Sequence, residues 1–75
     1  MNLKTEILRR IWQYVETSNP GTLIRLSDQE IVENLTKQVK NTLLLSSEDI
    51  NTLSRYLEAR IPLIRDLAYS KLAVS

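Results

Sequence analysis

The first seventeen residues alternate apolar and polar side chains with the period of an α-helix. From Asn2 to Thr17, at about 100° per residue, the apolar side chains sweep one half of a helical wheel. They are Leu3, Ile7, Leu8, Ile11, Trp12, Tyr14 and Val15. Asn2 is expected as the N-cap, and the residues at 18–21 (SNPG) carry the turn chemistry that ends a helix. The pattern predicts a helix over 2–17, followed by a short apolar connector at 22–26.

A second helix is predicted from its start signal. Ser27 is followed three residues later by Glu30, which is the spacing of a capping box, and Leu26 and Ile31 supply the flanking hydrophobic staple. The apolar residues after this point keep helical spacing on one face. They are Ile31, Val32, Leu35, Val39 and Leu43.

The same start signal returns at 45–50 (LSSEDI), where a leucine, a serine cap, an acidic residue and an isoleucine follow in the same order. A third helix is predicted there, with an apolar stripe of Ile50, Leu53, Leu57, Ile61, Ile64, Ala68 and Leu72. Pro62 interrupts it, because proline removes a backbone donor and crowds the preceding turn. Either one kinked helix runs from Ser47 to about Leu72, or two nearly coaxial helices meet at Pro62. The length slightly favours a break.

These elements predict an all-α fold in one domain, 1–75: a small bundle of three helices with a C-terminal fourth helix or Pro-kinked extension. The chain has 75 residues, of which 43% are apolar and 25% are charged, and a formal net charge of +1. This length allows a single modest core. The near-neutral balance points to neither nucleic acid nor anionic lipid.

Composition also restricts the chemistry. The chain has no histidine, no cysteine and one glycine, so zinc fingers, thiol chemistry, histidine catalysis and phosphate-binding glycine loops are not expected. The close carboxylates, Glu30 with Glu33 and Glu48 with Asp49, lie in helix-starting turns, where capping explains them. We therefore expect no enzyme, no cofactor, no metal and no small-molecule substrate. Lacking an apolar run that could span a membrane, the chain is expected in the cytoplasm.

Surplus apolar residues are the more informative feature. Trp12 and Tyr14 edge the first helix, and the last segment has apolar residues beyond its central stripe, Leu67 among them. A small domain often buries such a surplus by association. We expect the first helix and the 62–72 helix to contact either another protein or a second copy of the chain in a homodimer. The candidate anchors are Trp12, Tyr14, Tyr56, Leu63, Tyr69 and Leu72, with Arg9, Arg10 and Arg65 as rim charges. An equally weighted alternative is that both faces close the monomer's own bundle.

Binding of DNA by a helix-turn-helix is the alternative function. The basic residues available for it are Lys37, Lys40, Arg9 and Arg10, but acidic neighbours dilute each cluster. Nucleic acid is therefore a less favoured partner than protein, and a membrane surface ranks third.

The segments at 26–32 (LSDQEIV) and 61–68 (IPLIRDLA) resemble small all-helical proteins of unassigned function found in cyanobacteria. The resemblance covers about two thirds of the chain, and its motifs have low specificity. It implies a cytoplasmic bacterial setting and carries over no functional residue.

Overall fold

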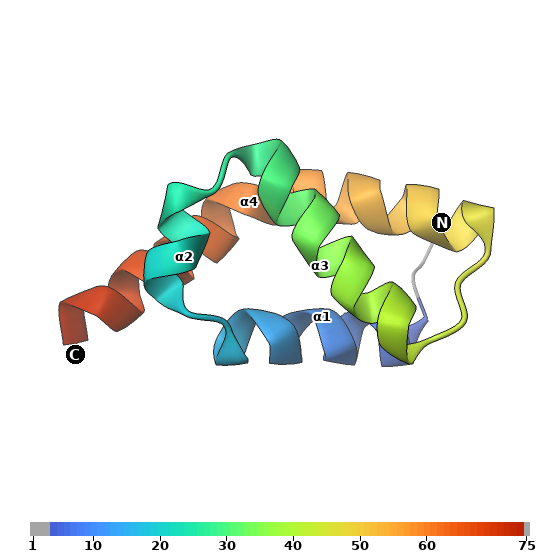
Figure 1. Cartoon of the computed structure of the whole chain (residues 1–75), viewed down its shortest axis with the longest axis horizontal. Helices are drawn as coiled ribbons and strands as arrows, with labels where there is room; N and C mark the ends of the chain where they lie inside the picture. Colours follow the sequence, from blue (N-terminus) through green and yellow to red (C-terminus); the bar gives the residue numbers. More distant parts are fainter. Residues whose placement is uncertain (1–3, 75) are drawn as a thin grey trace.

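The computed structural model describes residues 4–74 and is helical throughout, apart from short connections. Its helices are α1 (Thr5–Thr17), α2 (Pro20–Arg25), α3 (Asp28–Thr42) and α4 (Ser47–Val74). Figure 1 shows α3 crossing between α1 and α4, α2 packed beside the second half of α4, and the C-terminal end of α4 extending past α2. The predicted all-α bundle is confirmed, within an envelope of 37 × 19 × 19 Å.

The start of α1 differs from the prediction. Lys4 is the N-cap and makes no side-chain cap hydrogen bond, so the helix begins at Thr5. Asn2, the expected cap, lies outside the described residues. At the other end, Ser18 closes the helix by donating both its amide and its hydroxyl to the carbonyl of Tyr14. The inward face is the predicted one, with Ile7, Ile11 and Val15 buried.

The predicted connector at 22–26 is wrong, because most of it belongs to the short helix α2. Asn19 is the N-cap, and its Oδ1 accepts a 2.8 Å hydrogen bond from the amide of Gly21. Pro20 takes the first helical position, where its missing N–H and fixed φ suit a helix start. The residues that end α1 therefore also begin α2. Leu23 points inward and is buried.

Both serine start signals form reciprocal capping interactions. The Ser27 hydroxyl accepts from the amide of Glu30, and the Glu30 carboxylate accepts from the amide of Ser27. At α4, the Ser46 hydroxyl accepts from the amide of Asp49, and the Asp49 carboxylate accepts from the amide of Ser46. Each box satisfies two amides that a helix start would leave unpaired.

Helix α4 continues through Pro62, so the slightly favoured break is wrong and the alternative of one long helix is correct. Figure 1 shows α4 changing direction along its length. The apolar stripe explains the continuity. Leu57, Ile61, Ile64 and Ala68 stay buried on one side across the proline, so both halves are held by packing against α3 and α2.

One core joins all four helices, with most of its aliphatic side chains fully buried. Leu43, Leu45 and Ile50 are only partly buried, and Leu72, predicted at the end of the α4 stripe, is 40% exposed. The core is formed by Ile7, Ile11, Val15, Leu23, Ile31, Val32, Leu35, Val39, Leu53, Leu57, Ile61, Ile64 and Ala68.

Candidate functional site

Two of the candidate anchors, Trp12 and Tyr56, contact each other between α1 and α4. The indole Nε1 of Trp12 donates a 3.0 Å hydrogen bond to the Tyr56 hydroxyl, and the rings meet edge to face with centroids 6.5 Å apart. The guanidinium of Arg60 lies 4.8 Å from the centre of the Tyr56 ring, in cation–π geometry. Both aromatic side chains are partly buried. The pair therefore holds α1 to α4, and both side chains remain partly exposed to solvent.

Tyr14 is used inside the bundle. Its hydroxyl shares a hydrogen bond with the hydroxyl of Thr42 at the end of α3, and its ring packs against the core. The wide apolar arc of α1 thus closes the monomer's own bundle, which was the alternative to an interface for this helix.

The apolar surface that remains exposed is on the second half of α4. Leu63 is 46% exposed and Leu67 39%, while Tyr69 is 55% and Leu72 40% exposed. At about 100° per residue, Leu63 and Leu72 lie on opposite sides of the helix. The structure therefore separates anchors that the sequence analysis grouped in a single interface.

Leu63 and Leu67 share their side of α4 with the aromatic pair. They follow Tyr56 by seven and eleven residues, and Arg60 lies between at four, a spacing that keeps all of these residues on one side of a helix. We call this surface the α4 flank: Trp12, Tyr56, Arg60, Leu63 and Leu67. The sequence analysis missed Arg60, although its position one turn after Tyr56 was a usable signal.

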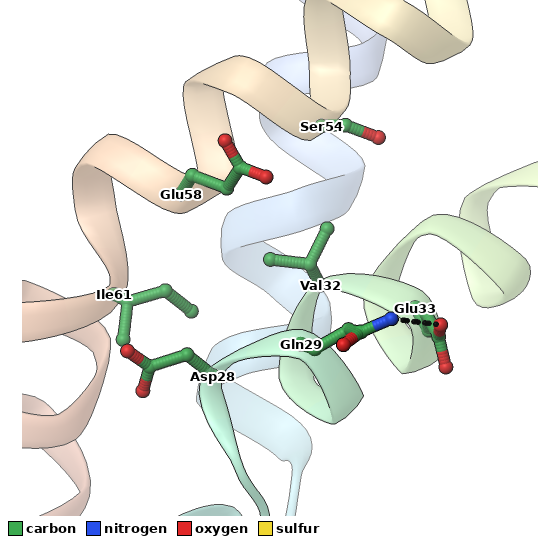
Figure 2. Close-up of a pocket in the computed structure, with 7 residues that line it drawn as sticks. All are labelled: Asp28, Gln29, Val32, Glu33, Ser54, Glu58 and Ile61. Carbon is green, nitrogen blue, oxygen red and sulfur yellow. Dashed lines mark hydrogen bonds between the residues drawn. The ribbon is translucent and has the colours of Figure 1, made fainter.

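A second surface is a groove between α3 and α4, made of two adjoining clefts of about 480 and 490 Å³. Figure 2 shows the first, with Val32 pointing from α3 towards Ser54 and Glu58 on α4. The clefts share Val32, Glu33 and Ser54, so they form one continuous surface, the α3–α4 groove. Its lining is Asp28, Gln29, Val32, Glu33, Thr36, Lys37 and Lys40 from α3, and Ile50, Ser54, Glu58 and Ile61 from α4.

The groove has opposite charges at its two ends. Asp28, Glu33 and Glu58 line one cleft, and Lys37 and Lys40 line the far part of the other. Between them lies Thr36, whose side chain is 9% exposed and whose hydroxyl has no hydrogen-bond partner among the described residues. A buried hydroxyl without a partner is uncommon and costly. Sequence analysis missed Thr36, although it stands at a core-facing position between Val32 and Val39.

The predicted rim charges have different surroundings. Arg9 and Arg10 line a shallow cleft of about 320 Å³ with Glu6, Gln13 and Leu43. Lys37 and Lys40 are exposed on α3. These basic residues thus lie beside acidic ones, as their order in the sequence indicated.

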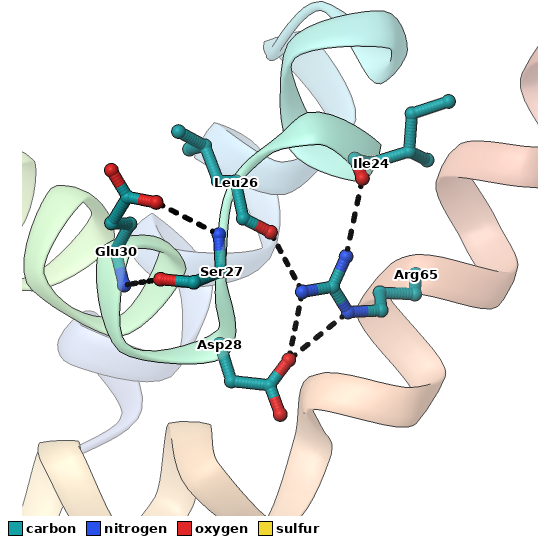
Figure 3. A network of polar contacts seen from close by, with 6 residues as sticks. All are labelled: Ile24, Leu26, Ser27, Asp28, Glu30 and Arg65. Atoms are coloured by element: carbon teal, nitrogen blue, oxygen red, sulfur yellow. Dashed lines mark hydrogen bonds and ion pairs between the residues drawn. The ribbon is translucent and has the colours of Figure 1, made fainter.

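Arg65 is an intramolecular clamp, which differs from the rim role predicted for it. Its Nη2 donates a 2.7 Å hydrogen bond to the Leu26 carbonyl and forms a 2.7 Å ion pair with Asp28, and its Nη1 lies 3.4 Å from the Ile24 carbonyl (Figure 3). It therefore holds the end of α2 and the start of α3 against α4. In the same way Lys71 donates to the carbonyl of Glu16 at the end of α1, a helix whose last turn has no basic residue of its own.

The Glu30 carboxylate is part of the capping box at the start of α3. The Ser27 backbone amide, followed by the Ser27 hydroxyl, lowers the pKa of Glu30 below its ordinary value. Within residues 4–74 there is no group of three or more acidic, histidine or cysteine side chains placed to hold a metal ion. Among the same residues, no helix combines the length and apolar character needed to cross a membrane.

Both surfaces are suited to contact with another molecule. The α4 flank combines exposed leucines with an aromatic pair and an arginine, and the groove has an acidic and a basic end. A search against protein-family models, curated proteins and solved structures found no match to this chain.

Proposed function

We propose that this chain is a protein-interaction module, a regulator, adaptor or subunit that acts by contact without catalysis and self-associates through the α4 flank. The observation that carries the proposal is the exposure of Leu63 and Leu67 beside the Trp12–Tyr56 pair and Arg60. Tryptophan, tyrosine and arginine are enriched among the residues that dominate binding energy at protein interfaces, above all near the well-packed centre of the contact. The setting proposed with it is the cytoplasm, which the absence of cysteine favours.

The exposed fractions set the strength of the expected contact. Fully burying a leucine gains about 2 kcal/mol, so a leucine with nearly half of its surface left gains about 1 kcal/mol. A twofold contact that covers Leu63 and Leu67 on both copies then gains about 4 kcal/mol before the cost of association. Contacts of the aromatic pair add to this gain, and ordering costs reduce it. We expect weak association that depends on concentration.

The test is the solution mass of the wild type and of a Leu63→Glu/Leu67→Glu variant, measured by light scattering over a wide range of concentrations. Leu44→Glu is the matched control, because Leu44 lies in the loop between α3 and α4 and is fully exposed. Circular dichroism verifies that all variants keep their helices. At about 500 mM salt, where contacts between exposed charges are screened, we expect the wild type and Leu44→Glu to associate and the double variant to stay monomeric. A wild type that stays monomeric, or a double variant that associates as the wild type does, would overturn the proposal.

DNA binding through α3 is the alternative, and the order of charges along the helix favours protein contact over it. Asp28, Glu30 and Glu33 occupy the first half of α3, whereas Lys37 and Lys40 occupy the second. A recognition helix enters the major groove with its N-terminal residues foremost, so the carboxylates would meet phosphate first. DNA affinity that falls steeply with salt, and is lost in Lys37→Glu/Lys40→Glu, would favour the alternative.

A further inference from the structure

The α3–α4 groove is acidic at one end and basic at the other, so two copies of it can pair in opposite directions. Along α3 the groove runs from Asp28 to Lys40, and α4 passes it in the opposite direction, from Ile50 to Ile61. The carboxylates of Glu58 and of Asp28, which is ion-paired with Arg65, are therefore at one end. Glu33 borders both clefts, and the ammonium groups of Lys37 and Lys40 are at the other end. A twofold axis across the middle of such a surface places the acidic end of one copy over the basic end of the next.

We propose that this groove pairs with the groove of a second copy of the chain, the two α3 helices lying antiparallel about a twofold axis near Thr36. The proposal goes beyond self-association through the α4 flank, because it rests on a different surface. The antiparallel order is selected by charge, since a parallel pair would place carboxylates over carboxylates and ammonium groups over ammonium groups.

The groove and the α4 flank can be occupied at the same time. Ser54 and Glu58 line the groove. Ser54 precedes Leu63 by nine residues, and Glu58 precedes Leu67 by nine residues. Nine residues at about 100° each is two and a half turns, so the two surfaces lie on opposite sides of α4. Contacts at the groove and at the flank are therefore separable by mutation.

The test uses two variants with opposite uniform charge. Lys37→Glu/Lys40→Glu makes the groove acidic throughout, and Glu33→Lys/Glu58→Lys gives both ends a net positive charge, because the remaining Asp28 is paired with Arg65. All four side chains are exposed, so the fold is expected to stay intact, which circular dichroism checks. Arg55→Glu, an exposed charge reversal on α4 away from the groove, is the matched control. Solution mass is measured by sedimentation for each protein alone and for an equimolar mixture of the two variants.

Every protein in this test carries Leu63→Glu/Leu67→Glu, which removes the flank contact, and is measured at about 20 mM salt. In that background we expect the native groove and Arg55→Glu to form dimers, each groove variant to stay monomeric, and the mixture to form a one-to-one heterodimer. Association through the native groove should weaken from about 20 mM to about 500 mM salt, as the screening length falls from roughly 20 Å to about 4 Å. At low salt we expect each groove variant to raise the Kd at least about tenfold.

Three results would overturn the groove contact: a monomeric Leu63→Glu/Leu67→Glu protein at low salt, a groove variant that still dimerises in that background, or a mixture that remains monomeric. The two proposals fail in different ways. If Leu63→Glu/Leu67→Glu abolishes association at low salt as well as at high salt, the flank is the interface and the groove proposal is wrong. If the groove variants are monomeric in the wild-type background, the groove is the interface and self-association through the flank is wrong.

Discussion

Replacing Arg65 with methionine tests whether the clamp between α4 and the α2–α3 turn stabilises the fold. Methionine keeps much of the apolar stem and removes the guanidinium. The change leaves the carbonyls of Leu26 and Ile24 without their side-chain donor and removes the ion pair with Asp28. No other basic side chain is recorded on these acceptors in residues 4–74.

The geometry sets the expected loss of stability. The 2.7 Å bond to the Leu26 carbonyl is a charge-assisted hydrogen bond from a guanidinium whose side chain is only 24% exposed, and such bonds contribute about 1.5 kcal/mol. Asp28 is 71% exposed, so the ion pair adds about 0.5 kcal/mol. The 3.4 Å contact to Ile24 is near the distance limit and adds little. We expect Arg65→Met to lower the free energy of unfolding by about 2 kcal/mol, or the Tm by roughly 8–16 °C.

The assay is urea denaturation followed by circular dichroism, at protein concentrations low enough to keep the chain monomeric. Arg55→Met is the control, because Arg55 is exposed on the same helix; we expect a change within about 0.5 kcal/mol. Asp28→Asn isolates the ion pair and should cost no more than about 1 kcal/mol. If Arg65→Met is as stable as Arg55→Met, the clamp contributes nothing and the reasoning is refuted.

Three other substitutions test local features of the fold. Thr36→Val removes the unpaired hydroxyl at nearly constant volume and should stabilise the monomer by about 1 kcal/mol in urea denaturation, whereas a loss would show that the hydroxyl has a partner. Pro62→Ala restores the missing amide of α4 and should also add about 1 kcal/mol; a decrease in the same assay would show that packing needs the proline. Ser27→Ala should cost about 1 kcal/mol and move the pKa of Glu30 back up towards its ordinary value in an NMR titration. Because the pKa of Glu30 is lowered in the folded protein, its carboxylate contributes its full stabilisation above the ordinary pKa. This contribution is lost as pH falls through the lowered pKa. Glu30→Gln should therefore remove this pH dependence of stability. An unchanged Glu30 pKa in Ser27→Ala would contradict this account of the capping box.

Helix starts and the buried stripes could be predicted because they depend on neighbouring residues. Ser27 with Glu30 and Ser46 with Asp49 form their caps within one turn, and the α3 stripe from Ile31 to Val39 is buried as its spacing indicates. The misread connector was also local. Asn19 and Pro20 end one helix and start the next, whereas the prediction from sequence assigns them only to the end of the first.

The candidate site depended on contacts between residues far apart in the chain. Trp12 lies 44 residues from the tyrosine that it contacts, and Arg65 lies 39 residues from the Leu26 carbonyl. Residue type indicated that these side chains could anchor or rim an interface. It could not indicate which of them the fold would use internally, because that depends on how α1, α2 and α3 are placed around α4.

The sequence by itself therefore determined the helical class, both capped helix starts and the identity of most core residues, since local hydrogen bonding and 3.6-residue periodicity decide these properties. Only the tertiary structure decided that α4 continues through Pro62, that Arg65 is a clamp, and that Leu63 and Leu67 are left on one exposed side. The physical reason is that burial and partner choice depend on the packing of whole helices. The energy gained by packing both halves of α4 can exceed the local cost of one proline in the helix. That balance cannot be predicted from the residues next to the proline alone.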